Sequence, residues 1–352
     1  MASLIMWWFT AKPGQGRIKD LAVFGDTIAA HIAVLAALEQ GLTVRWVRTR
    51  PDSPRPENRD AASEFDSLAP EGVRYLCHLL NEDDIRQLQL GYFTGIHRNH
   101  QYQAFDVTLL GHGIQFNTQQ LKHILQQKAG ERAQCLLESH LTITPGAKHW
   151  MVQDKRSGLA HPCRWIINAQ GEFSALSQQA PVYLSDDLWI ERKLCPQQEK
   201  STNQVFFNET PEGWQWSAWD NQGNLCETVW RNHRKGYCQS SQAVLTSRAF
   251  NARWYQRQHC LEYLTGAPTP ILLTIPTFVR FDPACGLGTS LHIKSALHAI
   301  SCIRECLSRP DKAQQALAQY QAAMLSTVKD ITGPMADFYL GYGIHAGKYY
   351  IP

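Results

Sequence analysis

Between residues 21 and 49 the spacing of the apolar positions changes twice. A short apolar run at 21–24 ends at Gly25, and the Ala-rich stretch 28–38 places its apolar residues at helical spacing. Gly41 follows, and residues 42–47 are again rich in side chains that favour strands. Because glycine interrupts regular structure and the two spacings are those of a strand and of a helix, the pattern predicts a strand, a helix and a second strand.

The turn that leads into this helix carries part of a dinucleotide-binding fingerprint. In G-x-G-x-x-G the three glycines permit a tight turn, close approach of the backbone to a diphosphate, and packing of the helix on the strand. Gly25, Thr27 and Ala30 occupy these positions, so a branched residue replaces the second glycine. The Thr27 hydroxyl is a possible donor to a phosphate.

The second predicted strand ends without the acid that usually binds the ribose hydroxyls. Arg48 is found there instead, and the next acid is Asp52. We therefore expect a nucleotide site with altered contacts, although the strand, turn and helix of any α/β protein would give the same pattern. The candidate residues in this stretch are Gly25, Asp26, Thr27, Ala30 and Arg48.

The remaining pattern predicts a mixed α/β chain. From residue 51 to 176 we expect, in order, a polar loop at 51–60, an N-capped helix at 71–80, a sheet segment at 91–110, an amphipathic helix at 117–128, short strands at 141–152, and a strand at 162–167 followed by a turn at 168–176. Alternating apolar and polar residues dominate from 182 to 273, which is typical of an antiparallel sheet. Trp214 and Trp216 share one face of it, as core residues or facing a substrate.

A glycine-rich loop at 281–289 opens the first of two further predicted helices, at 290–307 and 314–329. The free backbone N–H groups and the positive end of such a helix suit an anionic or carbonyl-rich group, such as the N1–C2=O edge of an isoalloxazine. Asp282 and Thr289 are also placed to cap the helix. The candidate residues are Asp282, Gly286, Leu287, Gly288 and Thr289.

Composition narrows the class of protein. With 352 residues, 44% of them hydrophobic, the chain can bury a large core. A net charge of +3 gives no general attraction to nucleic acid or membranes. The ten cysteines form no C-x-x-C pair, and we expect reduced thiols and no metal site. Without a recognisable signal peptide or membrane-spanning run, we expect a cytoplasmic location.

Five segments in this order resemble the flavin-dependent monooxygenase superfamily, and specifically its tryptophan-halogenase-like branch. They are the strand-helix-strand at 21–49, the D-S-L-A-P turn at 66–70, the turn at 168–176, the G-W-Q-W strand start at 213–216, and Asp282-Pro283 followed by Gly286-Leu287-Gly288. The resemblance spans roughly residues 20 to 310. It implies an α/β fold with a Rossmann-type FAD-binding domain, similar to that of para-hydroxybenzoate hydroxylase, interleaved with an antiparallel-sheet substrate domain.

The implied domains are discontinuous. Residues 18–80, 110–180 and 275–330 would form the FAD-binding domain, residues 81–109 and 181–274 the substrate or partner domain, and residues 331–352 a C-terminal segment. The chain departs from the branch where Leu273 to Thr277 lacks the aspartate that contacts the ribityl chain. Together with Thr27 and Arg48, this departure predicts weak or unusual FAD binding.

The halogenase G-W-x-W-x-I-P motif is incomplete here, because Ser217, Ala218 and Trp219 follow G-W-Q-W. No catalytic lysine of the halogenases is identifiable, which disfavours halogenation. Short members of the branch resemble the flavoproteins that mature tryptophylquinone cofactors of lysine and glycine oxidases. The resemblance thus implies an FAD-dependent monooxygenase that uses molecular oxygen on a tryptophan of a precursor amino-acid oxidase, in the biosynthesis of cysteine tryptophylquinone.

Two alternatives stay open at this point. One is a non-catalytic relative that serves as a binding module or chaperone for its partner, and the other is a hydroxylase of small aromatic molecules. The sequence assigns no catalytic base. Glu212, His97 and His292 are candidates for this base, and the sequence does not give their positions relative to a substrate.

Overall fold

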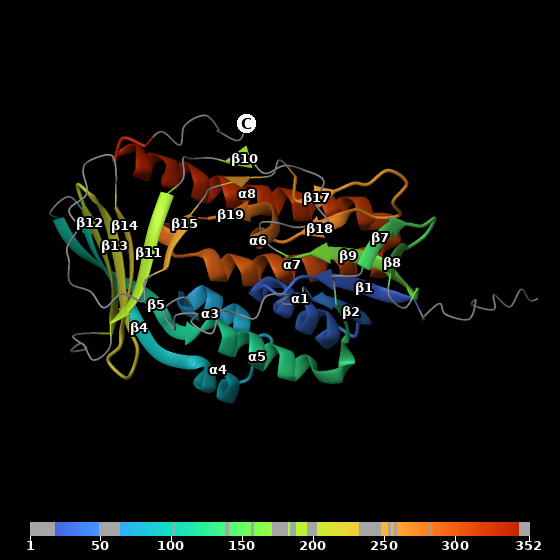
Figure 1. The fold of residues 1–352 in the computed structure, drawn as a ribbon, viewed down its shortest axis with the longest axis horizontal. Coiled ribbons are helices and arrows are strands. Elements are labelled where there is room, and N and C mark those ends of the chain that lie inside the picture. The colour runs from blue at the N-terminus through green and yellow to red at the C-terminus, as the bar shows by residue number, and fades with distance from the viewer. Residues whose placement is uncertain are drawn as a thin grey trace, which may run out of the picture.

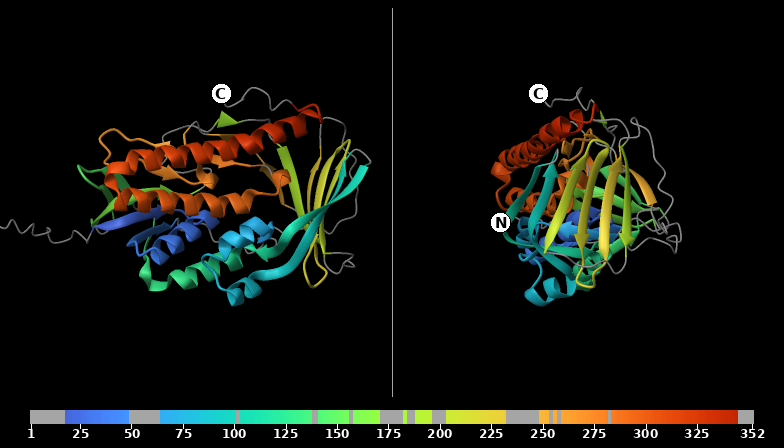
Figure 2. Two further views of the ribbon diagram at one scale, coloured as in Figure 1. Left: turned by 180° about the vertical axis from the view of Figure 1, so that it is seen from behind. Right: turned by 90° about the vertical axis from the view of Figure 1, so that its left-hand side faces the viewer.

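The computed structural model describes residues 18–48, 64–100, 103–137, 141–155, 158–170, 182–183, 188–195, 203–231, 248–252, 255–256, 259–281 and 283–344. These residues form a mixed α/β fold with two large sheets towards opposite ends of an elongated molecule (Figure 1). The long helix α8 (Ala313–Leu340) extends from the first sheet to the second, and α7 (Gly288–Ser308) lies beside it (Figure 2).

The first sheet has a parallel centre in the order β18-β9-β1-β2-β6. Its strands are β1 (Lys19–Phe24), β2 (Val44–Arg48), β6 (Gln134–Leu137), β9 (Ala160–Asn168) and β18 (Ile271–Leu273). Antiparallel strands extend it, namely β17 (Leu261–Glu262) beside β18, and the hairpin of β7 (Leu141–Pro145) and β8 (Trp150–Asp154) beside β9. The predicted strand, helix and strand at 21–49 is confirmed as β1, α1 and β2.

Helix α1 (Ile28–Glu39) lies in the middle of the core. Ten of its twelve residues are buried, as expected of a helix that is apolar all round and covered on several sides. It packs against α7 and against α5 (Thr118–Ala129), and the Asn117 side chain caps α5 by accepting from two backbone N–H groups. Of the shorter helices, α3 (Pro70–Leu76) contacts α7, whereas α4 (Glu82–Leu88) precedes the second sheet and α6 (Ile275–Phe278) follows β18.

The helix predicted at 71–80 is shorter than expected. It begins at Pro70, ends at Leu76, and has Ala69 at its N-cap without a side-chain hydrogen bond. Ala69 has no side-chain oxygen to accept from the first turn, and proline, which needs no N–H partner, takes the first helical position.

The second sheet has the order β15-β11-β14-β13-β12-β4-β5-β3 and is antiparallel except where β12 pairs with β4. Its strands are β3 (Phe65–Leu68), β4 (Gln89–His100), β5 (Gln103–Asn117), β11 (Leu188–Cys195), β12 (Gln204–Thr210), β13 (Gly213–Trp219), β14 (Leu225–Arg231) and β15 (Arg248–Ala252). A small third sheet joins β10 (Val182–Tyr183), β16 (Tyr255–Gln256) and β19 (Val279–Arg280).

One face of the second sheet is turned towards the rest of the molecule, and we call it the inner face. Phe207, Trp214 and Trp230 on this face pack against Tyr339 of α8. The Trp214 indole Nε1 donates to the Tyr339 hydroxyl at 2.9 Å, in a buried contact. Trp216 follows Trp214 by two residues and packs against the same cluster, which confirms that the two tryptophans share a face.

Sheet membership does not follow the predicted domain bounds everywhere. Strand β3 at 65–68 and residues 110–117 of β5 belong to the second sheet, and β17 and β18 at 261–273 belong to the first. Helix α8 also continues through residue 330 without a break. The reason is that long-range strand pairing and docking of α8 decide these memberships, whereas the local spacing of apolar residues decides only the type of element.

Among the described residues no helix is long and apolar enough to cross a membrane. The same part of the chain holds no cluster of three or more potential metal ligands, and its nine cysteines form no disulfide.

Candidate functional site

The β1–α1 turn brings the backbone of two strand ends into close contact. Gly25 has φ +122°, a conformation that side chains rarely adopt, and a Cβ atom there would lie 2.4 Å from the Ala169 carbonyl oxygen after β9. Ala30 is fully buried where α1 packs on the sheet. The first and third positions of the fingerprint therefore have the packing that the motif requires.

Thr27 is the N-cap of α1, and its hydroxyl is already engaged. It accepts from the Ala30 N–H at 3.2 Å and donates to the Ala169 carbonyl at 2.7 Å. The expected donation to a phosphate would require the loss of the bond to Ala169, since a hydroxyl has a single proton. The Thr27 side chain thus links the two strand ends at the N-terminus of α1.

Arg48 at the end of β2 forms an ion pair with Asp26 of the turn. Its Nη2 and Nε lie 2.8 Å and 3.0 Å from the same carboxylate oxygen, Oδ1. The guanidinium also stacks over Trp46 at 4.9 Å from the ring centroid and donates to Gln126 at 3.1 Å. Next to this pair lies His31, whose pKa burial lowers to about 4, so its imidazole is neutral near pH 7.

The glycine-rich loop before α7 leaves the start of that helix open. Gly286 has φ +65°, and Leu287 is the N-cap without a side-chain hydrogen bond. A Cβ atom at Gly286 or Gly288 would meet no atom within 4 Å, so the loop borders open space. Asp282 lies outside the described residues, so its expected capping role stays a prediction.

The expected cap by Thr289 is wrong, because its hydroxyl faces another element. It donates to Asp66 Oδ2 on β3 at 2.5 Å. Asp66 Oδ1 in turn accepts from the Ser67 N–H at 2.8 Å. The side chain of Thr289 therefore joins α7 to the second sheet, and no side chain of the described residues caps the start of the helix.

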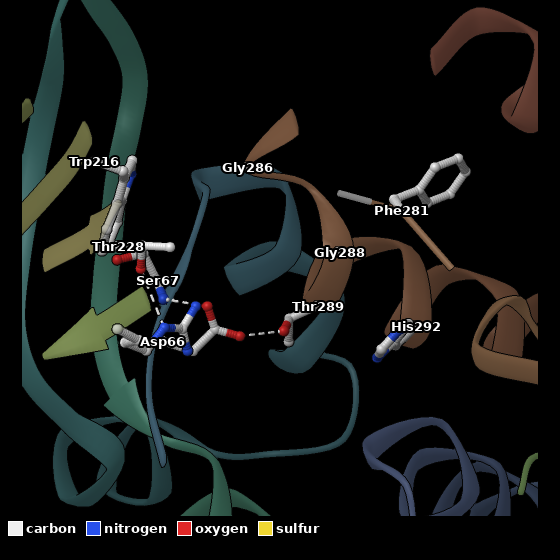
Figure 3. Close-up of a pocket in the computed structure, with 10 residues that line it drawn as sticks. Asp66, Ser67, Trp216, Thr228, Phe281, Gly286, Gly288, Thr289 and His292 are labelled. Carbon is white, nitrogen blue, oxygen red and sulfur yellow. Dashed lines mark hydrogen bonds between the residues drawn. The ribbon is translucent and has the colours of Figure 1, made fainter. Parts of the chain in front are cut away.

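A cavity of about 230 Å³ lies between this loop, β3 and the inner face of the second sheet (Figure 3). Trp216 and Thr228 line it from the sheet, and Thr289 and His292 line it from α7 (Figure 3). The complete lining is Asp66, Ser67, Arg192, Trp216, Thr228, Phe281, Gly286, Gly288, Thr289 and His292.

Arg192 and Ser67 are polar residues of the cavity wall. Arg192 donates from Nε to the Thr228 hydroxyl at 3.1 Å and from Nη1 to the Phe65 carbonyl at 3.0 Å, so its guanidinium is fixed at the wall. The Ser67 hydroxyl oxygen is buried and has no hydrogen-bond partner within the described part of the chain. Such an unpaired polar atom beside a cavity is where a bound polar group would find a partner.

The three candidate bases are separated by the fold. His292 lines the cavity. His97 binds Asp106 at 2.8 Å and packs on Phe206, which neighbours the inward-facing Phe207 and therefore points to the opposite face of the sheet. Glu212 is exposed in the turn between β12 and β13. Neither His97 nor Glu212 reaches the cavity.

Sequence reasoning missed most of the cavity lining as site residues. Asp66 and Ser67 were recognised only as part of the D-S-L-A-P motif. Trp216 was recognised only as a residue on the same strand face as Trp214. Arg192 and Thr228 carried no local signal, because single polar residues in an alternating strand are ordinary. Only the pairing of β11 with β14, which sets Arg192 opposite Thr228, brings them together.

No protein-family model matches the chain, and no curated protein matches it in sequence. Solved structures do match its fold. The peptidyl tryptophan dihydroxylase QhpG, essential for tryptophylquinone cofactor biogenesis, is 14% identical with a TM-score of 0.60, over 90% of this chain and 75% of that chain.

Two further matches have higher structural scores. The p-nitrophenol 4-monooxygenase PnpA from Pseudomonas putida is 12% identical with a TM-score of 0.72, over 92% of this chain and 89% of its own. The myxobacterial chondrochloren halogenase CndH, an FAD-dependent halogenase, has the same identity and score over 92% of this chain and 83% of its own. The protein therefore has the fold of the FAD-dependent monooxygenases and halogenases, as its ordered sequence motifs predicted.

Proposed function

We propose that the protein is an FAD-dependent monooxygenase that oxygenates a tryptophan of a precursor protein, as a step in making the cysteine tryptophylquinone cofactor of a partner amino-acid oxidase. The observation that carries the proposal is the cavity between the start of α7 and the face of the second sheet that carries Trp216. The fold shared with QhpG, a peptidyl tryptophan dihydroxylase, supports the choice of substrate.

The residues present fit a flavin at the cavity. Gly286 and Gly288 border open space, and no side chain of the described residues caps the N–H groups at the start of α7, which suits the electron-rich N1–C2=O edge. Gly25 and Ala30 provide the turn and packing for the dinucleotide half. When bound and reduced, FAD supplies the activation of molecular oxygen for insertion into an aromatic ring.

Trp216 and Arg192 are our assignment for holding the target ring. Trp216 gives the cavity a flat aromatic wall, against which an indole packs in an offset or edge-to-face arrangement. Arg192, fixed by Thr228 and Phe65, places a cation at the same wall, where it attracts the electron-rich face of an indole. Apolar Phe281 helps to exclude water.

Asp66 is our candidate for the proton acceptor. Oxygen insertion at an aromatic carbon leaves a proton there that must depart before the ring regains aromaticity, and a carboxylate in the cavity can take it. The Thr289 hydroxyl and the Ser67 N–H orient that carboxylate. His292, the only one of the three earlier candidates at the cavity, is the second choice.

The test has two stages. The purified protein is first examined by absorption spectroscopy, and the released cofactor is identified after denaturation. The reduced holoprotein is then exposed to oxygen with the precursor protein, and the precursor is analysed by mass spectrometry. The expected result is bound FAD and the gain of one or two oxygen atoms on a single tryptophan.

Other outcomes distinguish the alternatives. The PnpA fold match favours small aromatic substrates as the second candidate, so free indoles and phenols are assayed in parallel. Activity on these alone would assign a small-molecule hydroxylase. A protein that takes up no FAD and still binds the precursor would overturn the enzyme and leave a binding module.

A further inference from the structure

Arg48 occupies the position at the end of β2 where the fingerprint normally has a ribose-binding acid. An acid, Asp26 of the β1–α1 turn, lies beside it. Phe24 of β1 pairs with Val47 of the parallel strand β2, so Asp26, two residues after Phe24, and Arg48, one residue after Val47, lie at the same edge of the sheet. Arg48 Nη2 contacts Asp26 Oδ1 at 2.8 Å. The Asp26 carboxylate is therefore in contact with the side chain of the last residue of β2. This is the edge formed by the carboxyl ends of the strands, where α/β sheets bind nucleotides.

Among the described residues, only one of the two Asp26 carboxylate oxygens accepts from Arg48. Both bonds from Arg48 end on Oδ1. Oδ2 faces the Lys122 ammonium at 3.9 Å, beyond hydrogen-bonding distance, and the Asp26 side chain is 29% exposed. A carboxylate oxygen in this state can accept from vicinal hydroxyl groups, which is what the missing acid of the fingerprint would have done.

Arg48 is itself held, so it can fix the carboxylate in one orientation. It stacks on Trp46, whose indole Nε1 donates to the Gly25 carbonyl at 3.0 Å, and it donates to Gln126 of α5. The neutral His31 beside the pair adds no charge to it. A carboxylate oriented in advance in this way binds hydroxyls without first losing conformational freedom.

We propose that Asp26 is the ribose-binding acid of this protein, moved from the end of β2 to the β1–α1 turn, and that Arg48 is the residue that positions it. The inference rests on the proposed use of FAD. The two cations Arg48 and Lys122 and the one carboxylate of Asp26 leave this group with a net charge of about +1. This positive charge would favour the diphosphate of the dinucleotide.

The experiment measures dissociation constants for FAD and for FMN, which lacks the adenosine, by titration calorimetry on the full-length apoprotein. Asp26→Asn and Asp26→Ala remove the charged acceptor and are expected to weaken FAD binding about tenfold, with FMN binding unchanged. Arg48→Ala releases the carboxylate and is expected to give a smaller loss, again for FAD only.

The decisive variant is Asp26→Asn combined with Arg48→Glu, which returns an acid to the end of β2 and is expected to recover most of the lost FAD affinity. Glu39→Gln is the matched control, because Glu39 pairs with Arg132 at 2.9 Å in a different ion pair. Thermal melts verify that each variant is folded.

Three results would overturn the inference. Asp26→Asn with wild-type FAD affinity would do so and leave the proposed function standing. Equal weakening of FAD and FMN would do so as well, because it would mark a structural effect on the turn. A wild-type protein that binds neither flavin would overturn both the inference and the proposed function.

Discussion

Thr289 on α7 donates its hydroxyl proton to the carboxylate of Asp66 on β3 across 2.5 Å, although the two residues are 223 positions apart. Nearby, a Cβ atom at Gly72 of α3 would lie 2.5 Å from the Ser290 hydroxyl, so α3 and α7 are in close contact. The hydrogen bond and this contact hold the glycine-rich loop at a fixed distance from the second sheet, and the cavity lies between them.

Asp66→Asn removes the proposed proton acceptor while keeping its shape and its hydrogen bond from Thr289. We expect oxygenation of the precursor to slow by about 10²- to 10⁴-fold with FAD affinity unchanged, because proton transfer contributes only to the reaction step. Single-turnover mass spectrometry of the precursor measures it. Thr289→Val, which keeps the carboxylate, should slow the reaction by at most about tenfold, and a wild-type rate for Asp66→Asn would remove Asp66 from the mechanism.

Gly25→Ala places a methyl group against the Ala169 carbonyl and a side chain at φ +122°. We expect a loss of roughly 3 kcal/mol in the free energy of unfolding, from backbone strain and steric overlap together. Urea denaturation measures the change. Gly41→Ala is the control, because Gly41 also has positive φ but a Cβ atom there meets nothing within 4 Å, so it should lose only about 1 kcal/mol. Equal losses for the two variants would contradict the close-packed turn.

Tyr339→Phe leaves the buried indole N–H of Trp214 without its acceptor. An unsatisfied buried donor costs about 1–3 kcal/mol, so the variant should unfold at lower urea concentration. Tyr75→Phe is the control, since its exposed hydroxyl binds Glu71 one helical turn away and should change stability by less than about 0.5 kcal/mol. Wild-type stability of Tyr339→Phe would show that the contact between α8 and the sheet does not depend on this bond.

The buried His31 predicts a loss of stability in mild acid. Burial lowers its pKa from 6.5 to about 4, so between these values the unfolded chain binds a proton that the folded chain does not. Stability therefore falls as the pH drops from 6.5 to 4, by roughly 3 kcal/mol from this group. His31→Gln should flatten the pH dependence of the unfolding free energy in that window.

Part of this slope is expected to remain in His31→Gln. Burial also lowers the pKa of His161 and of His298, and both act in the same direction. His97→Gln serves as the comparison variant, because its ring lies on the outer face of the sheet beside Asp106. An unchanged slope in His31→Gln would show that the buried imidazole is not responsible.

Elements whose physical requirements are local could be predicted from the order of amino acids. Helical spacing fixed α1, α5 and α7, and the alternation of apolar residues placed Trp214 and Trp216 on one face. The glycine positions were predictable as well, because the β1–α1 turn at Gly25 and the loop at Gly286 need positive φ, which other residues resist. The order of these motifs was enough to predict the fold.

Which polar groups meet depends on how the whole chain packs. Asp66, Arg192 and Thr289 come from three distant segments, and their proximity depends on strand register and on the docking of α7. Likewise, the sequence placed Arg48 where an acid was expected, and the fold alone showed Asp26 beside it. Local periodicity encodes which face of an element is buried, whereas a contact between distant side chains results from the packing of the whole chain.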